Sequence, residues 1–413
     1  AEDGIRDYKV TGVQTCALPI FISDDGVMIN YYIKGTEKKA LVFVHGYSCS
    51  SEYWWPQLEY FSKDHTVIAV DIAGHGKSGV NRQEYSMDAF GNDVTSVIEH
   101  LDLEEVVLIG HSMGGPVVVK AANNLGVKSI AHGCTAAGND QVRFEVILSA
   151  LSPEIELLAP IRDQAWQRKD QINYLEERKL PVPTKGSSYS INRGLWGVTI
   201  GGKETLTSQG SIPESEWYLS ANALLNNQPE ETHTITFDKG IPVAIDQKKL
   251  NIIELIELLD TMGAKFGVGR GIHLGDTIIQ TKGRVAFEAP AAEIIIQTHR
   301  ELEKLVLSSS QIKIKELIAL NYVDLIHEGK NLDPVCADIE CFLASSQSYV
   351  SGEISFNISP GRLFITGVDS PYSLMKASKS KYGESASEWT PNDAKGFTKI
   401  QSLSGIFLQR ARK

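Results

Sequence analysis

Residues 106–125 read Val-Val-Leu-Ile-Gly-His-Ser-Met-Gly-Gly-Pro-Val-Val-Val-Lys-Ala-Ala-Asn-Asn-Leu. The continuous apolar run from Val106 to Ile109 is typical of a buried parallel strand. Glycines on both sides of Ser112 leave room for a strained turn, and residues 116–125 have the apolar spacing of a helix. Gly126 is a helix stop, and Val127 to Ile130 is expected to form the next strand. The stretch therefore predicts an α/β fold, with a parallel sheet and flanking helices.

Two further apolar runs precede this stretch. Ala40 to Val44 leads into His45-Gly46-Tyr47, and Thr66 to Val70 leads into Asp71-Ile72-Ala73-Gly74-His75-Gly76. With a Gly-x-Ser-x-Gly motif between strand and helix, residues 21–122 resemble the start of an α/β-hydrolase. The resemblance implies that Ser112 is the nucleophile and that the backbone N–H groups of Tyr47 and Met113 form the oxyanion hole.

A serine nucleophile also needs a base to take its proton. In α/β-hydrolases the acid and the histidine follow the serine on later strand ends. The later histidines here each have another predicted place, in loops, before a hairpin or on amphipathic helices: His132, His233, His273, His299 and His327. A serine hydrolase using Ser112 is therefore one alternative function, and it predicts a severely impaired enzyme.

A polar loop, residues 131–144, follows the expected strand that ends at Ile130. Thr135, Asn139, Asp140 and Arg143 offer a hydroxyl, an amide, a carboxylate and a guanidinium within nine positions. Arg143 suits the carboxylate of an amino-acid ligand and Asp140 suits its ammonium group. The alternative is an ordinary turn between a strand and a helix.

Residues 123–413 resemble argininosuccinate synthases through separated blocks. They are His132 to Phe144, Lys185 to Thr199, Gly267 to Gly271, Ser370 to Leu374 and Glu388 to Ala394. The resemblance implies a cytoplasmic ligase of arginine biosynthesis that joins citrulline to aspartate with ATP and Mg, giving argininosuccinate, AMP and pyrophosphate.

The site residues follow from the same resemblance. Thr135, Asn139 and Asp140 would hold aspartate. Asn139 and Arg143 would contact citrulline, as would Ser190 and Thr199, and Gly133 would lie against the nucleotide. Gly275 and Phe287 lack the carboxylate and the phenol that some members use for citrulline, and Glu288 is either a substitute or a structural residue.

The family's pyrophosphate loop, Ser-Gly-Gly-Leu-Asp-Thr-Ser, occurs nowhere in the sequence. Hydrolase-type sequence occupies that place, so ATP turnover is expected to be lost. Residues 1–20 resemble a translated sequencing adapter and are set aside. The sequence thus predicts a chimera joined between about Lys120 and Leu125, and a non-catalytic module that binds citrulline and aspartate is a further alternative.

Composition limits the classes of partner. The 413 residues carry a net charge of -11, which argues against nucleic acid and anionic membranes, and no apolar run is long enough to cross a bilayer. Five cysteines without paired metal-ligand spacing indicate a reducing compartment and no metal site. A cytoplasmic protein is therefore expected.

The predicted organisation has five parts. They are the adapter-like segment 1–20, the hydrolase-type fragment 21–122, the adenine-nucleotide-hydrolase-like remainder of the nucleotide domain 123–178, the mixed α+β catalytic and multimerisation domain 179–378, and the C-terminal arm 379–413. Helices are expected at 250–262, 291–307 and 311–326, and hairpins around 238–240 and 359–361. The arm is expected to pack on another subunit of a homo-oligomer such as a homotetramer.

Overall fold

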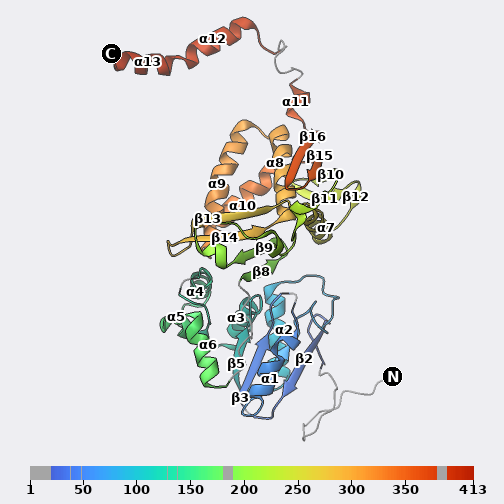
Figure 1. Ribbon diagram of the computed structural model, residues 1–413, viewed down its shortest axis with the longest axis vertical. Coiled ribbons are helices and arrows are strands. Elements are labelled where there is room, and N and C mark those ends of the chain that lie inside the picture. Colours follow the sequence, from blue (N-terminus) through green and yellow to red (C-terminus); the bar gives the residue numbers. More distant parts are fainter. Residues whose placement is uncertain are drawn as a thin grey trace. The chain divides into compact units, whose positions relative to one another are not determined.

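The computed structural model describes residues 20–37, 39–47, 49–127, 129–136, 138–179, 189–378 and 388–413. The adapter-like segment lies outside these residues except for Ile20, which begins the first strand. The chain divides into two compact units between Tyr174 and Leu175, and each unit is described by itself (Figure 1).

The first unit contains a five-stranded mixed sheet in the order β1-β2-β4-β3-β5. Its strands are β1 (Ile20–Ile22), β2 (Met28–Lys34), β3 (Lys39–Val44), β4 (Thr66–Val70) and β5 (Glu105–Gly110). The three predicted apolar runs form β3, β4 and β5, which are parallel to one another. Strands β1 and β2 add an antiparallel edge that the sequence pattern did not predict.

Helices cover both faces of this sheet. They are α1 (Trp55–Phe61), α2 (Met87–His100) and α3 (Gly114–Leu125). Val42, Val44 and Ile68 are fully buried in the core that includes residues of α2 and α3. The alternate residues Phe43 and Val67 pack in the core that includes Leu58 of α1. This alternation explains why both strands are apolar throughout.

The sheet ends at β5 among the described residues. The expected next strand forms as β6 (Ser129–Ala131), but it pairs in parallel with β7 (Glu156–Leu158) in a separate two-stranded sheet. Helices α4 (Asp140–Leu151), α5 (Pro160–Asp163) and α6 (Arg168–Glu177) complete this region. The predicted α/β class and the predicted strand after α3 are confirmed. This strand, β6, buries none of its three residues and pairs with β7 outside the five-stranded sheet.

A buried ion-pair network fixes the loop between β4 and α2. The Arg82 guanidinium donates to both oxygens of Asp93, at 2.8 and 2.7 Å, and its Nε donates to Asp25 at 2.7 Å. The side chains of Arg82 and Asp93 are 3% and 2% exposed. Hydrogen bonding from Arg82 lowers the pKa of Asp25 from 3.8 to about 2.

The second unit contains two antiparallel sheets. One has the order β13-β14-β9-β8 and the other β12-β11-β10-β15-β16. The strands are β8 (Ser190–Gly194), β9 (Gly197–Gly201), β10 (Glu231–Asp238), β11 (Ile241–Ile245), β12 (Lys248–Lys249), β13 (Arg270–Asp276), β14 (Lys282–Glu288), β15 (Gly352–Ser359) and β16 (Arg362–Asp369). Both predicted hairpins are confirmed as β10–β11 and β15–β16.

The helices of the second unit are α7 (Ile252–Lys265), α8 (Pro290–Val306), α9 (Ser309–His327), α10 (Pro334–Ser346), α11 (Leu374–Ala377), α12 (Pro391–Gln401) and α13 (Leu403–Ala411). The first three confirm the predicted helices. Leu259 of α7, Ile294 of α8 and Phe356 of β15 are fully buried in one core. Helix α9 buries none of its own residues. The end of the chain, expected as an arm, forms α12 and α13, which also bury none.

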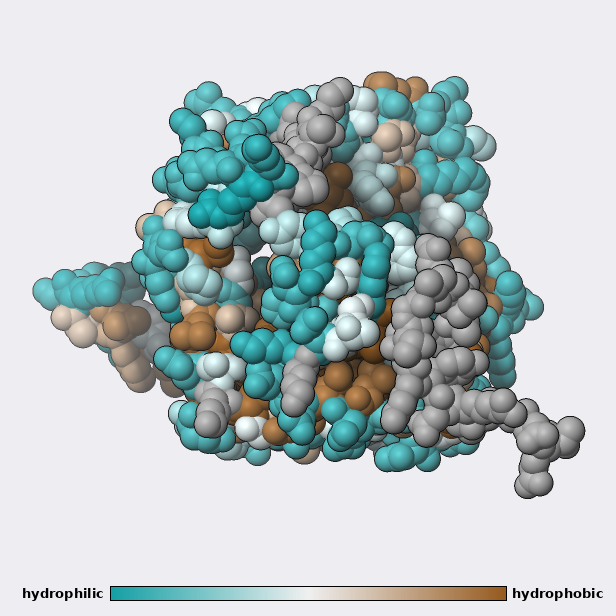
Figure 2. Space-filling model, turned by 90° about the horizontal axis from the view of Figure 1, so that it is seen from below, coloured by the Kyte–Doolittle hydropathy of each residue, from teal (hydrophilic) through white to brown (hydrophobic). Residues whose placement is uncertain are grey.

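The face of the molecule in Figure 2 is mostly hydrophilic, and its hydrophobic residues form separate patches. In the described part of the chain, every helix is too short or too polar to cross a membrane.

Replacing Arg82 by methionine should lower the free energy of unfolding of the first unit by about 3–5 kcal/mol, because it leaves the Asp93 carboxylate buried without its cation. Urea denaturation of the full chain measures the change. Lys34→Met is the control, since it breaks an exposed pair with Glu59 and should cost less than about 1 kcal/mol. Similar losses for both variants would contradict a stabilising role for the network. The contribution of Asp25 should be complete above pH 3.8 and lost as pH falls through about 2.

Candidate functional site

Ser112 lies at the tight turn between β5 and α3. Its φ of 54° is in the left-handed region that residues with a Cβ rarely adopt. Two close backbone approaches impose this conformation. A Cβ at Gly110 would lie 2.2 Å from the carbonyl oxygen of Gly114, and one at Gly114 would lie 2.4 Å from that of Val44. Only glycine fits at these two positions, so the predicted strand, turn and helix are confirmed.

Tyr47 and Met113 flank Ser112. A Cβ at Gly46 would lie 3.0 Å from Cβ of Ser112, so the chain entering Tyr47 passes directly beside the serine. Met113 follows Ser112 and packs against the core of the first unit. The structure thus brings the three predicted hydrolase residues together. Their roles as nucleophile and oxyanion hole stay predictions.

No imidazole is hydrogen-bonded to the hydroxyl of Ser112 among the described residues. His45, which precedes Gly46, donates from Nδ1 to the carbonyl oxygen of Gly46 at 2.7 Å, and its Nε2 accepts from the Ile72 amide at 3.3 Å. Burial lowers the pKa of His45. Its two ring nitrogens are therefore both occupied, and the turn has its geometry without an acid–base partner.

The predicted polar loop becomes the connection between β6 and α4. Helix α4 begins at Asp140, so Asp140 and Arg143 stand on the first helical turn. The carbonyl oxygen of Asn139 accepts from the Arg143 amide at 3.2 Å, which closes this turn. Gly133 and Thr135 lie in the exposed part of the loop. The structure therefore places Asn139, Asp140 and Arg143 at one helix N-terminus and Gly133 and Thr135 in the loop that leads into it.

Asp140 and Arg143 pair with each other. Nη1 of Arg143 donates to Oδ1 of Asp140 at 3.0 Å, and the two side chains are 36% (Arg143) and 71% (Asp140) exposed. Exposed pairs of this kind contribute less than about 1 kcal/mol. A zwitterionic ligand can therefore exchange with this pair, with its ammonium taken by Asp140 and its carboxylate by Arg143.

His132 and Glu145 form a network that sequence reasoning missed. Nε2 of His132 lies 3.2 Å from Oε1 of Glu145, and the same carboxylate accepts from Arg162. Phe144, next to Glu145, stacks on His132 at 6.3 Å and lies against Gly115 of α3. The polar loop and the Ser112 turn are thus neighbours within the first unit. The link is non-local, so helical spacing within α4 could have indicated Asp140–Arg143 but not His132–Glu145.

Ser190 and Thr199 lie in the second unit, on one face of the β8–β9 hairpin. Ser190 pairs with Gly201 and Asn192 pairs with Thr199, and cross-strand partners share a face. Thr199 also pairs with Phe287 of β14. The opposite face carries Val198, Ile200 and Ala286, which are buried in a core. The hydroxyls therefore lie on the open face of the sheet.

Gly275 and Phe287 share this open face, but Glu288 does not. Glu288 is fully buried and accepts from the amides of Leu219 at 2.9 Å and Ser220 at 3.0 Å. Of the two readings of Glu288, the geometry agrees with the structural one. A Cβ at Gly275 would lie 2.3 Å from Nε2 of His273. Strand alternation could have found His273 and Asn192, which the sequence reasoning did not assign to this face.

Comparison with known proteins identifies the family. A family model described as arginosuccinate synthase C-terminal domain matches residues 189–407, more than half of the chain. The chain belongs to the argininosuccinate synthase family. A second model, described as alpha/beta hydrolase fold, matches residues 39–179. Both predicted resemblances are confirmed. The second match continues past residue 122 to residue 179 and does not locate the predicted join. The position of the join and the other domain boundaries stay predictions.

Relatives in this family cover most of the chain. Argininosuccinate synthase from Methanocaldococcus jannaschii is 34% identical over 296 residues, which are 72% of this chain and 74% of that protein. The enzyme from Dictyoglomus turgidum is 32% identical over 390 residues, covering 89% and 96%. A solved structure, the Cif epoxide hydrolase from Acinetobacter nosocomialis, is 26% identical over 31% of this chain and 41% of its own, with a TM-score of 0.26.

Argininosuccinate synthases use ATP, and free backbone amides at a helix N-terminus can bind phosphate groups. The amides of Gly114 and Gly115 donate to the carbonyl oxygens of His111 at 2.9 Å and Ser112 at 2.8 Å. They are therefore already engaged and do not fit a phosphate group. Groups of three or more potential metal ligands do not occur in the described ranges.

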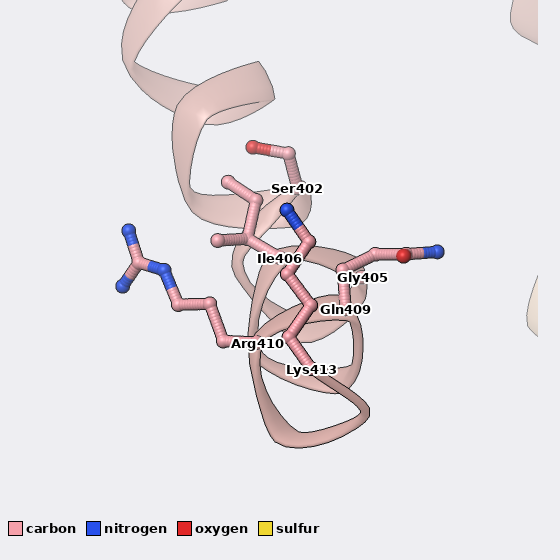
Figure 3. Close-up of a pocket in the computed structure, with 6 residues that line it drawn as sticks. All are labelled: Ser402, Gly405, Ile406, Gln409, Arg410 and Lys413. Atoms are coloured by element: carbon pink, nitrogen blue, oxygen red, sulfur yellow. The ribbon is translucent and has the colours of Figure 1, made fainter.

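A hollow on α13 is not a substrate site. It is lined by Ser402, Gly405, Ile406, Gln409, Arg410 and Lys413 (Figure 3). These residues are three or four positions apart and form one stripe along a single helix. The stripe is a helix face that combines an apolar side chain with two cations.

The strain at Ser112 can be measured. Ser112→Gly should be more stable than Ser112→Ala by about 1 kcal/mol, because glycine adopts a positive φ without the Cβ penalty. Thermal denaturation compares the two variants. At Ser149, an exposed helical position in α4, the order should be reversed, with glycine the less stable by about 1 kcal/mol. If glycine were not the better residue at 112, the turn would be unstrained.

Proposed function

We propose that this chain binds aspartate and citrulline as argininosuccinate synthases do but does not complete the ATP-dependent ligation. The observation that carries the proposal is the exposed Asp140–Arg143 pair on the first turn of α4, beside Thr135 and Asn139. This turn and the loop before it carry a carboxylate, a guanidinium, an amide and a hydroxyl.

Each group has a complementary part of an amino acid. The Asp140 carboxylate takes the ammonium of aspartate, and Thr135 and Asn139 hydrogen-bond its carboxylates. Arg143 takes the carboxylate of citrulline, and Asn139 is a further proposed contact for citrulline. The N-terminus of α4 adds a partial positive charge that favours these carboxylates. Ser190 and Thr199, on the open face of the second unit, offer hydroxyls to citrulline.

Ligation needs more than these contacts, because the ureido oxygen must be activated by ATP. The family's pyrophosphate loop is absent from the sequence, and the glycine amides at the start of α3 are engaged with the turn. We therefore assign no step to ATP in this chain, and Gly133 remains a proposed contact for a nucleotide. Ester hydrolysis is not proposed either. The positive φ of Ser112 supplies nucleophile geometry, but the described residues place no base on its hydroxyl.

Asp140→Asn should weaken aspartate binding at least about tenfold, because a charge-assisted hydrogen bond to the ligand's ammonium is lost. Isothermal titration calorimetry measures the dissociation constant. Asp88→Asn is the matched control, since it removes an exposed carboxylate paired with Lys120 on other helices and should leave binding unchanged. A pyrophosphate-release assay with ATP, citrulline and aspartate should give no signal. Release that depends on both amino acids would overturn the proposed inactivity.

We further propose that the C-terminal arm, residues 388–413, packs on a second copy of this chain. Phe397, Ile400 and Phe407 are 63%, 68% and 55% exposed, which is unusual for side chains of this size. The arm carries the cationic stripe of α13. A groove between α9 and α10 is lined by apolar residues together with Asp324 and Glu328, so its charge is complementary to the arm.

Phe407→Glu should shift the chain from an oligomer to a monomer, because it places a charge in the apolar contact. Sedimentation velocity measures the mass. Leu206→Glu is the control, since Leu206 is 79% exposed in the second unit but lies outside the arm and the groove. A wild-type monomer, or an unchanged oligomer in Phe407→Glu, would refute this use of the arm.

A further inference from the structure

The open face of the β13-β14-β9-β8 sheet carries two rows of side chains. In one row, Asn192, Thr199, Phe287 and Gly271 follow one another through consecutive strand pairs. In the other, Ser190 pairs with Gly201 on one side of the sheet, and Val285 pairs with His273 on the other side. The face therefore has hydroxyls and an amide at its β8–β9 side and aromatic rings at its β13–β14 side.

The middle of this face is open at Gly201, where a Cβ would have no neighbour within 4 Å. Strands β8 and β13 are three strand spacings apart, about 14 Å. Ser190 and His273 stand on these two outer strands. A small extended molecule over Gly201 can therefore contact hydroxyls at one end and an imidazole at the other.

His273 occupies the place from which a side chain at 275 would project. A Cβ at Gly275 would lie 2.3 Å from Nε2 of His273, so any side chain there requires the ring to move. Phe287 lies in the same way over Gly271, where a Cβ would be 2.4 Å from the ring. The two rings cover the two glycines, and this end of the face presents an imidazole and an apolar ring instead of a carboxylate and a phenol.

The replacement changes the chemistry of recognition. Citrulline has one cationic group, its α-ammonium, and a carboxylate on this face would pair with it. An imidazole can donate from one ring N–H to a carbonyl oxygen, which a carboxylate cannot do, and it lacks the negative charge with which a carboxylate pairs with an ammonium. Phe287 adds apolar contact area beside Thr199. Both changes favour a ligand whose α-nitrogen is uncharged and carries an acyl group.

We propose that His273 is a specificity-determining residue and that this subsite selects N-acylated ureido acids, such as N-acetylcitrulline, over citrulline. The acyl carbonyl accepts a hydrogen bond from the imidazole, and the acyl methyl group contacts Phe287. The proposal rests on the proposed function, since it names the ureido ligand of the same site. It concerns the second unit, whereas the aspartate contacts lie in the first.

Calorimetry of the full chain with N-acetylcitrulline and with citrulline tests the proposal. N-acetylcitrulline should bind at least about tenfold more tightly, the difference expected for a hydrogen bond gained and an unpaired charge avoided. His273→Leu should weaken N-acetylcitrulline about tenfold and leave citrulline unchanged. The double variant His273→Ala, Gly275→Glu should reverse the preference, because it restores a carboxylate where the ring no longer blocks it.

Leu274→Ala is the matched control, since this neighbour on β13 is 60% exposed and points to the opposite face. It should leave both affinities as in the wild type. Tighter binding of citrulline than of N-acetylcitrulline would overturn the inference and leave the proposed function standing. Failure of both ureido acids to bind would overturn the inference together with the citrulline part of the proposed function. The aspartate part of the proposed function is tested independently, by the effect of Asp140→Asn on aspartate binding.

Discussion

The pairing of β5 limits what the first unit can do. Among the described residues this strand has one neighbour in its sheet, β3, and the sheet ends there. In α/β-hydrolases the acid and the base arrive on strands that come later in the chain. Here the next strand, β6, pairs with β7 and leads into the polar loop at residues 131–144. Among the described residues, no strand beyond β5 extends the five-stranded sheet beside Ser112.

The first unit contains a buried and an exposed ion pair. Arg82 and Asp93 are buried and bidentate, so they hold the loop after β4 in one arrangement. The pair of Asp140 with Arg143 is exposed, so it contributes little to stability. Glu145 lies between these extremes, half buried and shared by His132 and Arg162. Burial therefore distinguishes a structural pair from one that suits ligand exchange.

Much of the fold could be predicted from local pattern. Continuous apolar runs predicted β3, β4 and β5, and helical spacing predicted α3 and α7 to α9. Hairpin β8–β9 was missed because every residue of β8 is exposed, which leaves no alternation to detect. The partner of β6 could not be predicted, because partner choice between short strands depends on residues distant in the chain.

The candidate site shows the same division between local and distant information. Motifs and resemblance predicted Ser112, the loop at residues 133–143, Ser190 and Thr199 as site residues. In the structure, Ser112 and the loop lie in the first unit, and Ser190 and Thr199 lie in the second. Predicting the ion pair of Asp140 with Arg143 requires knowing that α4 begins at Asp140. The stacking of His132 on Phe144 and the position of His273 over Gly275 needed tertiary contacts and strand register, which no single stretch of sequence contains.

The backbone geometry of the turn at Ser112 is set by its immediate surroundings. Its left-handed backbone is imposed by Gly110, Gly114 and the end of β3, all of which precede or adjoin the serine in the chain. None of these constraints involves an acid or a base. The 87 residues from the start of β3 at Lys39 to the end of α3 at Leu125 therefore contain every described constraint on the backbone of Ser112.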